Sequence, residues 1–140
     1  MPRSPASLLV RLVAVVIALA VAISVVFAMT TIFITMARGF SLVDVLTAPI
    51  AFVFFAGPPL LVVGMASRAK TGAAAVVALL LAVTFAVGLA VFEGAPWHFR
   101  HWRASAAEAE AQMLIATLFA AWPLTLVGML LSARLNRETD

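Results

Sequence analysis

No Asp, Glu, Lys, Arg or His occurs in four long stretches of the chain, residues 12–37, 45–67, 71–92 and 111–133. An α-helix needs roughly 20 apolar residues to cross about 30 Å of hydrocarbon, and each stretch is at least that long. Because lipid offers no hydrogen bonds to the backbone, such a stretch has to be helical. The sequence therefore predicts an all-α integral membrane protein with four transmembrane helices in a single membrane domain, 1–140.

The overall composition agrees with this fold class. Hydrophobic residues make up 65% of the chain and charged residues only 11%, against about a quarter in soluble domains. The basic start of the chain, with Arg3 and Arg11 before an apolar run, resembles a signal peptide. That run is about twice as long as a signal h-region, so we expect it to be retained as the first helix.

The second half of the chain repeats the first at a displacement of 64 residues. Residues 55–65 read FAGPPLLVVGM and residues 119–129 read FAAWPLTLVGM. The same displacement aligns Ala14 with Ala78 and Ser41 with Ser105, without any insertion or deletion. The sequence predicts a tandem duplicated helical hairpin with a parallel two-fold pseudo-repeat, about 8–68 and about 72–134.

Prolines interrupt the second and fourth stretches. A proline lacks the amide donor and clashes with the carbonyl four residues earlier, so the carbonyls of Phe54, Phe55 and Phe119 are expected to lose their helical partners. These kinks could form a binding site or passage at the membrane midplane. Alternatively, they shape helix packing, with the freed carbonyls bonded inside the protein. The positions assigned to the kinks are Phe55, Gly57, Pro58, Pro59, Phe119 and Pro123.

Small residues recur at steps of four along the first and third helices. Such faces let two helices approach closely in a membrane. We expect the first helix to pack against the third, although the same faces could instead form a homodimer. Glycines in the second and fourth helices fit close packing as well. The residues assigned to packing are Ala14, Ala18, Ala22, Ala74, Ala78, Ala82, Ala86, Gly64 and Gly128.

Two Ser-x-x-acid pairs precede the second and fourth helices. Ser41 with Asp44, and Ser105 with Glu108, match the capping box, in which the serine accepts from a backbone amide of the first turn. A carboxylate lining an entrance is the alternative interpretation. Capping explains both members of each pair, so we assign all four residues to helix caps.

The two halves diverge after the third helix. The segment 93–104 contains aromatic and basic side chains, which suit a short stretch in the headgroup layer. Its His98 and His101, with Glu93, are the chain's weak candidates for a metal site. Two histidines provide only two ligands, and no spacing here demands a metal. We therefore predict neither a metal nor another cofactor.

The basic residues are interpreted as topology signals and not as a nucleic-acid surface. By the positive-inside rule the more basic side faces the cytoplasm, which places both termini there, in a bacterial inner (plasma) membrane. The six basic residues of that side are Arg3, Arg11, Arg68, Lys70, Arg134 and Arg137, and those of the other side are Arg38, Arg100 and Arg103.

The residue types absent from the four stretches restrict the functions that the chain can have. They contain no carboxylate or histidine of the kind that proton-coupled transport uses, and no nucleophile or nucleotide motif occurs. The leading hypothesis is a non-catalytic accessory or assembly subunit of a larger membrane complex, whose partners are the lipid bilayer and other membrane subunits or copies of itself. The alternative is a small homo-oligomeric transporter or channel for an apolar or neutral solute, using the kinked second and fourth helices.

Overall fold

The computed structural model of the chain describes residues 5–36, 42–94 and 117–138. It is all-helical within these residues, and no strand occurs among them. The elements are α1 (Pro5–Met36), α2 (Leu42–Arg68), α3 (Gly72–Gly94), the π-helical turn η1 (Thr117–Ala121) and α6 (Trp122–Arg137).

Three of the helices are long and apolar enough to cross a membrane. Their spanning segments are Pro5–Phe27, Val45–Arg68 and Gly72–Ala90. This confirms the prediction of an all-helical, multi-pass membrane protein. The beginning of the predicted fourth stretch, 111–116, lies outside the described residues. The fourth transmembrane crossing therefore stays a prediction, although α6 is continuous with η1.

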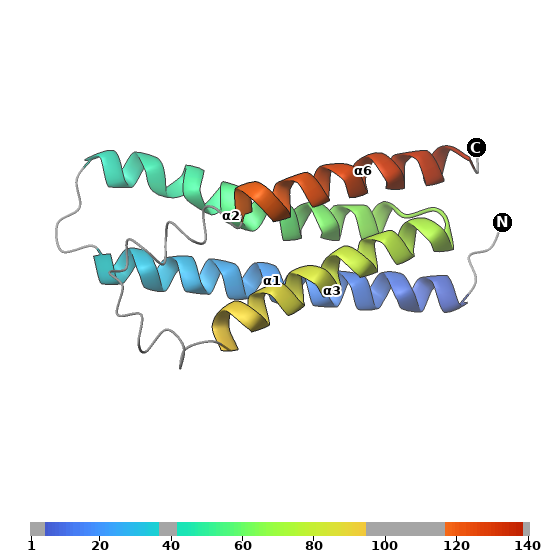
Figure 1. Cartoon of the computed structure of the whole chain (residues 1–140), viewed down its shortest axis with the longest axis horizontal. Coiled ribbons are helices and arrows are strands. Elements are labelled where there is room, and N and C mark those ends of the chain that lie inside the picture. Colours follow the sequence, from blue (N-terminus) through green and yellow to red (C-terminus); the bar gives the residue numbers. More distant parts are fainter. Residues whose placement is uncertain (1–4, 37–41, 95–116, 139–140) are drawn as a thin grey trace.

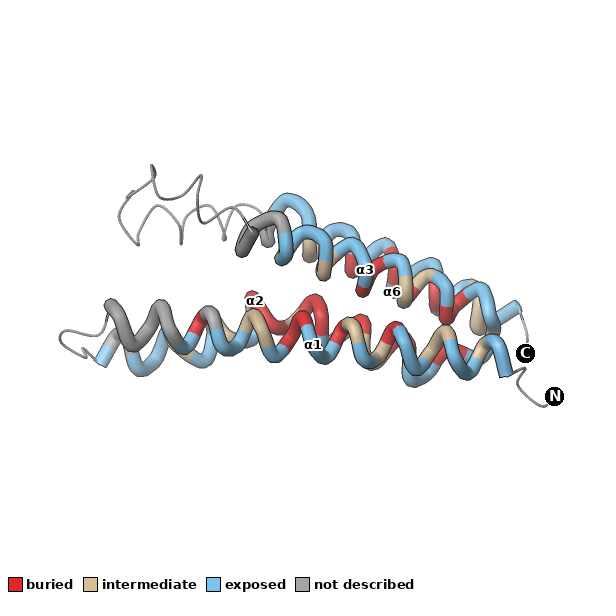
Figure 2. The backbone as a smooth tube through the Cα atoms, turned by 90° about the horizontal axis from the view of Figure 1, so that it is seen from below, coloured by how far each residue is buried: buried red, intermediate tan, exposed pale blue. Residues whose placement is uncertain are grey.

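The helices form two pairs that pack face to face. Figure 1 shows each helix running opposite to the one before it, with both chain ends at the same end of the bundle. In Figure 2, α1 and α2 form one layer and α3 and α6 the other, and buried residues lie mainly between the layers. Helices α2 and α3 both have central positions, because each of them contacts the three other helices.

The most extensive contact joins α1 to α3, as the small-residue faces predicted. Ala14 and Ala18 of α1 and Ala78 and Ala82 of α3 belong to one buried cluster. Alanine side chains let the two backbones approach closely, so dispersion contacts between them replace contacts with lipid. The other buried members of the cluster are Val62, Met65, Ala66 and Leu81.

A second, smaller cluster closes the bundle beside the α2–α3 turn. Ala69, Ala74 and Ala75 are buried there, and Val10 of α1 and Leu135 of α6 pack against them. Helix α3 begins at this turn with a side-chain cap that the sequence analysis missed. The hydroxyl oxygen of Thr71 accepts a hydrogen bond of 3.0 Å from the amide of Ala74, the geometry of an N-cap.

Large apolar side chains cover the outside of the bundle on every described helix. Residues such as Phe27, Ile50, Leu80 and Leu130 are exposed. In water such a surface would be an aggregation hazard, but in a bilayer these side chains face hydrocarbon. The buried interior of this bundle thus contains smaller residues than its exposed surface.

Candidate functional site at the helix kinks

Helix α2 remains helical through its three prolines. Pro49, Pro58 and Pro59 all lie inside the assigned helix. Pro58 and Pro59 are buried, so this part of α2 faces protein and not lipid. A proline at position 58 cannot donate to the carbonyl of Phe54, which is four residues earlier. That carbonyl needs another donor if it is to remain at membrane depth.

Trp122, the first residue of α6, provides this donor. Its indole Nε1 donates a hydrogen bond of 3.0 Å to the carbonyl oxygen of Phe54. The backbone group that Pro58 cannot bond is therefore satisfied by a side chain from the other layer of the bundle. The bond also joins the middle of α2 to the start of α6, whose sequences are 68 residues apart.

The indole ring packs closely against α2. The ring centroids of Trp122 and Phe54 lie 5.9 Å apart at a tilt of 35°, and Phe54 meets Phe55 edge to face at 5.4 Å. A Cβ atom added at Gly57 would lie 3.0 Å from the Trp122 ring. Gly57 is thus the residue that lets the indole approach the backbone closely enough to bond Phe54.

The second proline site, at the start of α6, is built differently. The π-helical turn η1 leads directly into α6, and Pro123 is the second residue of that helix. A π-turn widens the helix locally and accommodates irregular backbone. The hydroxyl of Thr125 donates a hydrogen bond of 2.6 Å to the carbonyl of Ala121. The wide turn and this side-chain bond shape the helix on either side of Pro123.

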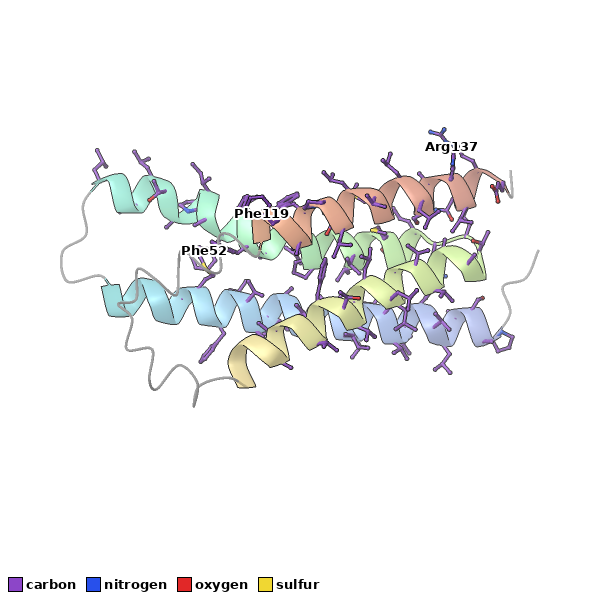
Figure 3. All side chains as sticks on the ribbon, viewed as in Figure 1. Phe52, Phe119 and Arg137 are labelled. Carbon is purple, nitrogen blue, oxygen red and sulfur yellow. The ribbon has the colours of Figure 1, made fainter. Side chains whose placement is uncertain are left out.

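Phe55 and Phe119, which the repeat aligns, have different surroundings. Phe55 is 8% exposed and Phe119 is 80% exposed; Figure 3 marks Phe119 beside the start of α6. The two kinks do not present equivalent surfaces to a common space. Part of this difference follows from the sequence, because the residue of the second repeat that aligns with Pro58 is Trp122.

The glycines assigned to packing also differ. A Cβ atom at Gly128 would overlap Cδ1 of Leu81 and lie 3.4 Å from Cε of Met65, so α6 closely approaches α3 and α2 there. At Gly64 a Cβ atom would meet nothing within 4 Å. Close approach at Gly64 is therefore not found within the described part of the chain. Of the nine packing residues, Ala14, Ala18, Ala22, Ala74, Ala78, Ala82 and Gly128 are buried, and Ala86 and Gly64 are half-buried.

Most of the polar candidates fall where the structure gives no side-chain description. Asp44 lies in the first turn of α2 and Glu93 in the last turn of α3, without described side chains. No group of three His, Cys, Asp or Glu that could hold a metal occurs within 5–36, 42–94 and 117–138. The candidates outside the described residues are Ser41, His98, His101, Ser105 and Glu108.

Arg11 has a role that goes beyond the topology signal assigned to it from the sequence. Its Nε donates a hydrogen bond of 3.0 Å to the carbonyl of Ala66, and its Nη2 donates to the carbonyl of Ser67. These carbonyls belong to the last turn of α2, where carbonyls lack intrahelical partners and a cation is favoured. Arg11 therefore ties α1 to the end of α2.

The comparisons with known proteins give no match. The chain matches no protein-family model, no curated protein and no solved structure.

Proposed function

We propose that this chain is a small, non-catalytic membrane protein that serves as an accessory or assembly subunit of a larger membrane complex. The observation that carries the proposal is the hydrogen bond from Trp122 to the Phe54 carbonyl. A solute-binding kink would use this carbonyl as a ligand. In this protein the Trp122 indole bonds the carbonyl, and Gly57, which has no side chain, leaves space for the indole ring. The kink is therefore part of the packing.

The contrast between inside and outside supports the same proposal. The buried cluster is made mainly of alanines, whereas large apolar side chains lie on the outer faces of α1, α2, α3 and α6. Such an exterior can contact either lipid or the apolar surface of another membrane subunit. Partners in a complex would dock on these outer faces, because the alanine faces are already paired within the monomer.

We also propose that the chain arose by tandem duplication of a helical hairpin. In support, Ala14 and Ala18 meet Ala78 and Ala82, their partners at the displacement of 64, in one cluster. A two-fold axis between α1 and α3 would produce this self-matching contact. The second helices have diverged further. Helix α6 buries Thr125, Gly128 and Ser132, whereas α2 buries Val62, Met65 and Ala66, which are not their aligned counterparts.

The proposed location is a bacterial inner membrane with both termini in the cytoplasm. Arg68 and Lys70 lie at the α2–α3 turn, and Arg134 and Arg137 lie in the last turns of α6. Figure 1 places that turn and both chain ends at one end of the bundle. The positive-inside rule assigns this more basic end to the cytoplasm.

The test is extraction of the tagged protein from its native membrane under mild, lipid-preserving conditions, followed by mass determination and identification of every bound component. The proposal predicts a defined set of larger membrane subunits at a fixed ratio. Recovery of a homo-oligomer alone, combined with solute flux in reconstituted vesicles that Pro59→Ala with Pro123→Ala abolishes, would replace it by the transporter hypothesis.

A further inference from the structure

Exposed arginines gather at the end of the bundle that holds the α2–α3 turn. Arg68 ends α2, and Arg134 and Arg137 lie in the last turns of α6. All three side chains are exposed, and Figure 3 shows Arg137 projecting away from the bundle near the end of α6. Lys70, between α2 and α3, adds a fourth positive charge. Glu138 is the single acidic residue at this end among the described residues.

The fold holds these cations together even though they come from distant parts of the chain. The backbone amide of Lys70 donates a hydrogen bond of 2.9 Å to the side-chain oxygen Oδ1 of Asn136. Next to Asn136, Leu135 of α6 packs against the buried cluster of Ala69, Ala74 and Ala75. The α2–α3 turn is therefore fastened to the last turn of α6, and Arg68 is brought to the same end as Arg134.

Arg11 lies at the same end of the bundle but has a structural role. It donates hydrogen bonds to the carbonyls of Ala66 and Ser67, so its guanidinium neutralises the end of the α2 dipole. Within 5–36, 42–94 and 117–138, no side-chain hydrogen bond or ion pair joins Arg68, Arg134 or Arg137 to another protein group. Their charged side chains are exposed at this end of the bundle.

Arg68 and Lys70 lie where one helix long and apolar enough to span a membrane ends and the next begins, and in a bilayer such a turn reaches the headgroup layer. Arg68 closes one spanning segment and Gly72 opens the next, so the short turn between them marks the membrane boundary. We propose that this basic end, made of Arg68, Lys70, Arg134 and Arg137, binds the headgroup phosphates of anionic phospholipids. A guanidinium can donate two parallel hydrogen bonds to a phosphate, and basic residues beside a membrane attract anionic lipid. This inference holds whether or not the chain serves as an accessory subunit.

The experiment uses the full chain in detergent with equal amounts of phosphatidylglycerol and phosphatidylcholine, and native mass spectrometry measures the lipid retained. The wild type should retain phosphatidylglycerol preferentially. Because one basic residue contributes about a five-fold gain in affinity, Arg134→Gln with Arg137→Gln should lower phosphatidylglycerol affinity about 25-fold. Arg134→Lys with Arg137→Lys keeps the charge and should restore most of the retention.

A control substitution on the exposed side of α3, Thr84→Ala, leaves the charges of the basic end intact and should change retention by less than about two-fold. Circular dichroism verifies that every variant stays helical. A separate arm adds millimolar inorganic phosphate, which should leave the bound lipid in place. A loss in Thr84→Ala equal to that in the glutamine pair, no preference for phosphatidylglycerol in the wild type, or displacement of the lipid by inorganic phosphate would overturn the proposal.

Discussion

Trp122 donates its indole hydrogen to the carbonyl oxygen of Phe54 at 3.0 Å, across the two layers of the bundle. Pro58 deprives that carbonyl of its helical donor, and Gly57 provides the space in which the ring lies. The three features act together. A proline in one repeat creates an unpaired acceptor, and the tryptophan that replaces its counterpart in the other repeat satisfies it.

Replacing Trp122 with phenylalanine keeps an aromatic ring but removes the donor. The Phe54 carbonyl is then left without a partner at membrane depth, and we expect the free energy of unfolding to fall by about 1 kcal/mol. Unfolding in mixed detergent micelles, followed by circular dichroism, measures this change. Phe119→Leu, at an exposed aromatic residue of η1, is the control and should have a smaller effect. Equal stability of the wild type and Trp122→Phe would contradict the role of the bond.

Gly128 should tolerate a methyl group poorly. In Gly128→Ala the new Cβ would overlap Cδ1 of Leu81, so that side chain has to shift, and the same Cβ would lie 3.4 Å from Cε of Met65. We expect a loss of about 1–2 kcal/mol in the free energy of unfolding. Gly64→Ala is the matched control, since a Cβ there meets nothing within 4 Å and alanine is the better helix former. Equal losses of stability in Gly128→Ala and Gly64→Ala would contradict the close approach of helices at Gly128.

The α1–α3 interface should reject a larger side chain. Ala18 and Ala82 are almost fully buried, so Ala82→Leu must separate the two helices or force strained rotamers. The expected loss is about 1–3 kcal/mol, with earlier thermal unfolding of the monomer in detergent. Ala20→Leu, on an exposed face of α1, should unfold like the wild type. A loss of partners from Ala82→Leu without any change in its unfolding would instead place this face between subunits.

Arg11 should matter more to stability than the other basic residues. Arg11→Gln loses the hydrogen bonds to the carbonyls of Ala66 and Ser67, so the last turn of α2 should fray. We expect a cost of about 1 kcal/mol and faster hydrogen exchange at the end of α2. Arg137→Gln removes the same charge from an exposed position and serves as the control. Identical exchange in the two variants would contradict this assignment.

Much of the fold could be predicted because a membrane restricts the backbone conformations that a spanning segment can adopt. Long stretches without charge specify helices in lipid. The segments Val45–Arg68 and Gly72–Ala90 follow two of those stretches closely, whereas the first segment, Pro5–Phe27, begins before its stretch and includes Arg11. Alanines at every fourth position correctly indicated the α1–α3 contact, since close approach needs small side chains at that spacing.

The details of the kink were harder to predict, because they depend on contacts between distant residues. Prolines showed which carbonyls lose a donor, but no local pattern identifies Trp122 as the replacement. A signal was present in the repeat itself, where tryptophan occupies the position aligned with Pro58. Thr71 was missed for another reason. Its cap lacks the acidic residue of the capping box that marked the other two candidates.

The most direct test of the central claim, that the kinked backbone is part of the packing, is a double-mutant cycle between Pro58 and Trp122. Pro58→Ala restores an amide that can bond the Phe54 carbonyl within α2. The free energy of unfolding is measured for the wild type, Pro58→Ala, Trp122→Phe and the double variant. The account predicts that Trp122→Phe costs about 1 kcal/mol in the wild type and almost nothing in Pro58→Ala. Equal costs in both backgrounds would show that the indole does not hold the freed carbonyl, and would contradict the account.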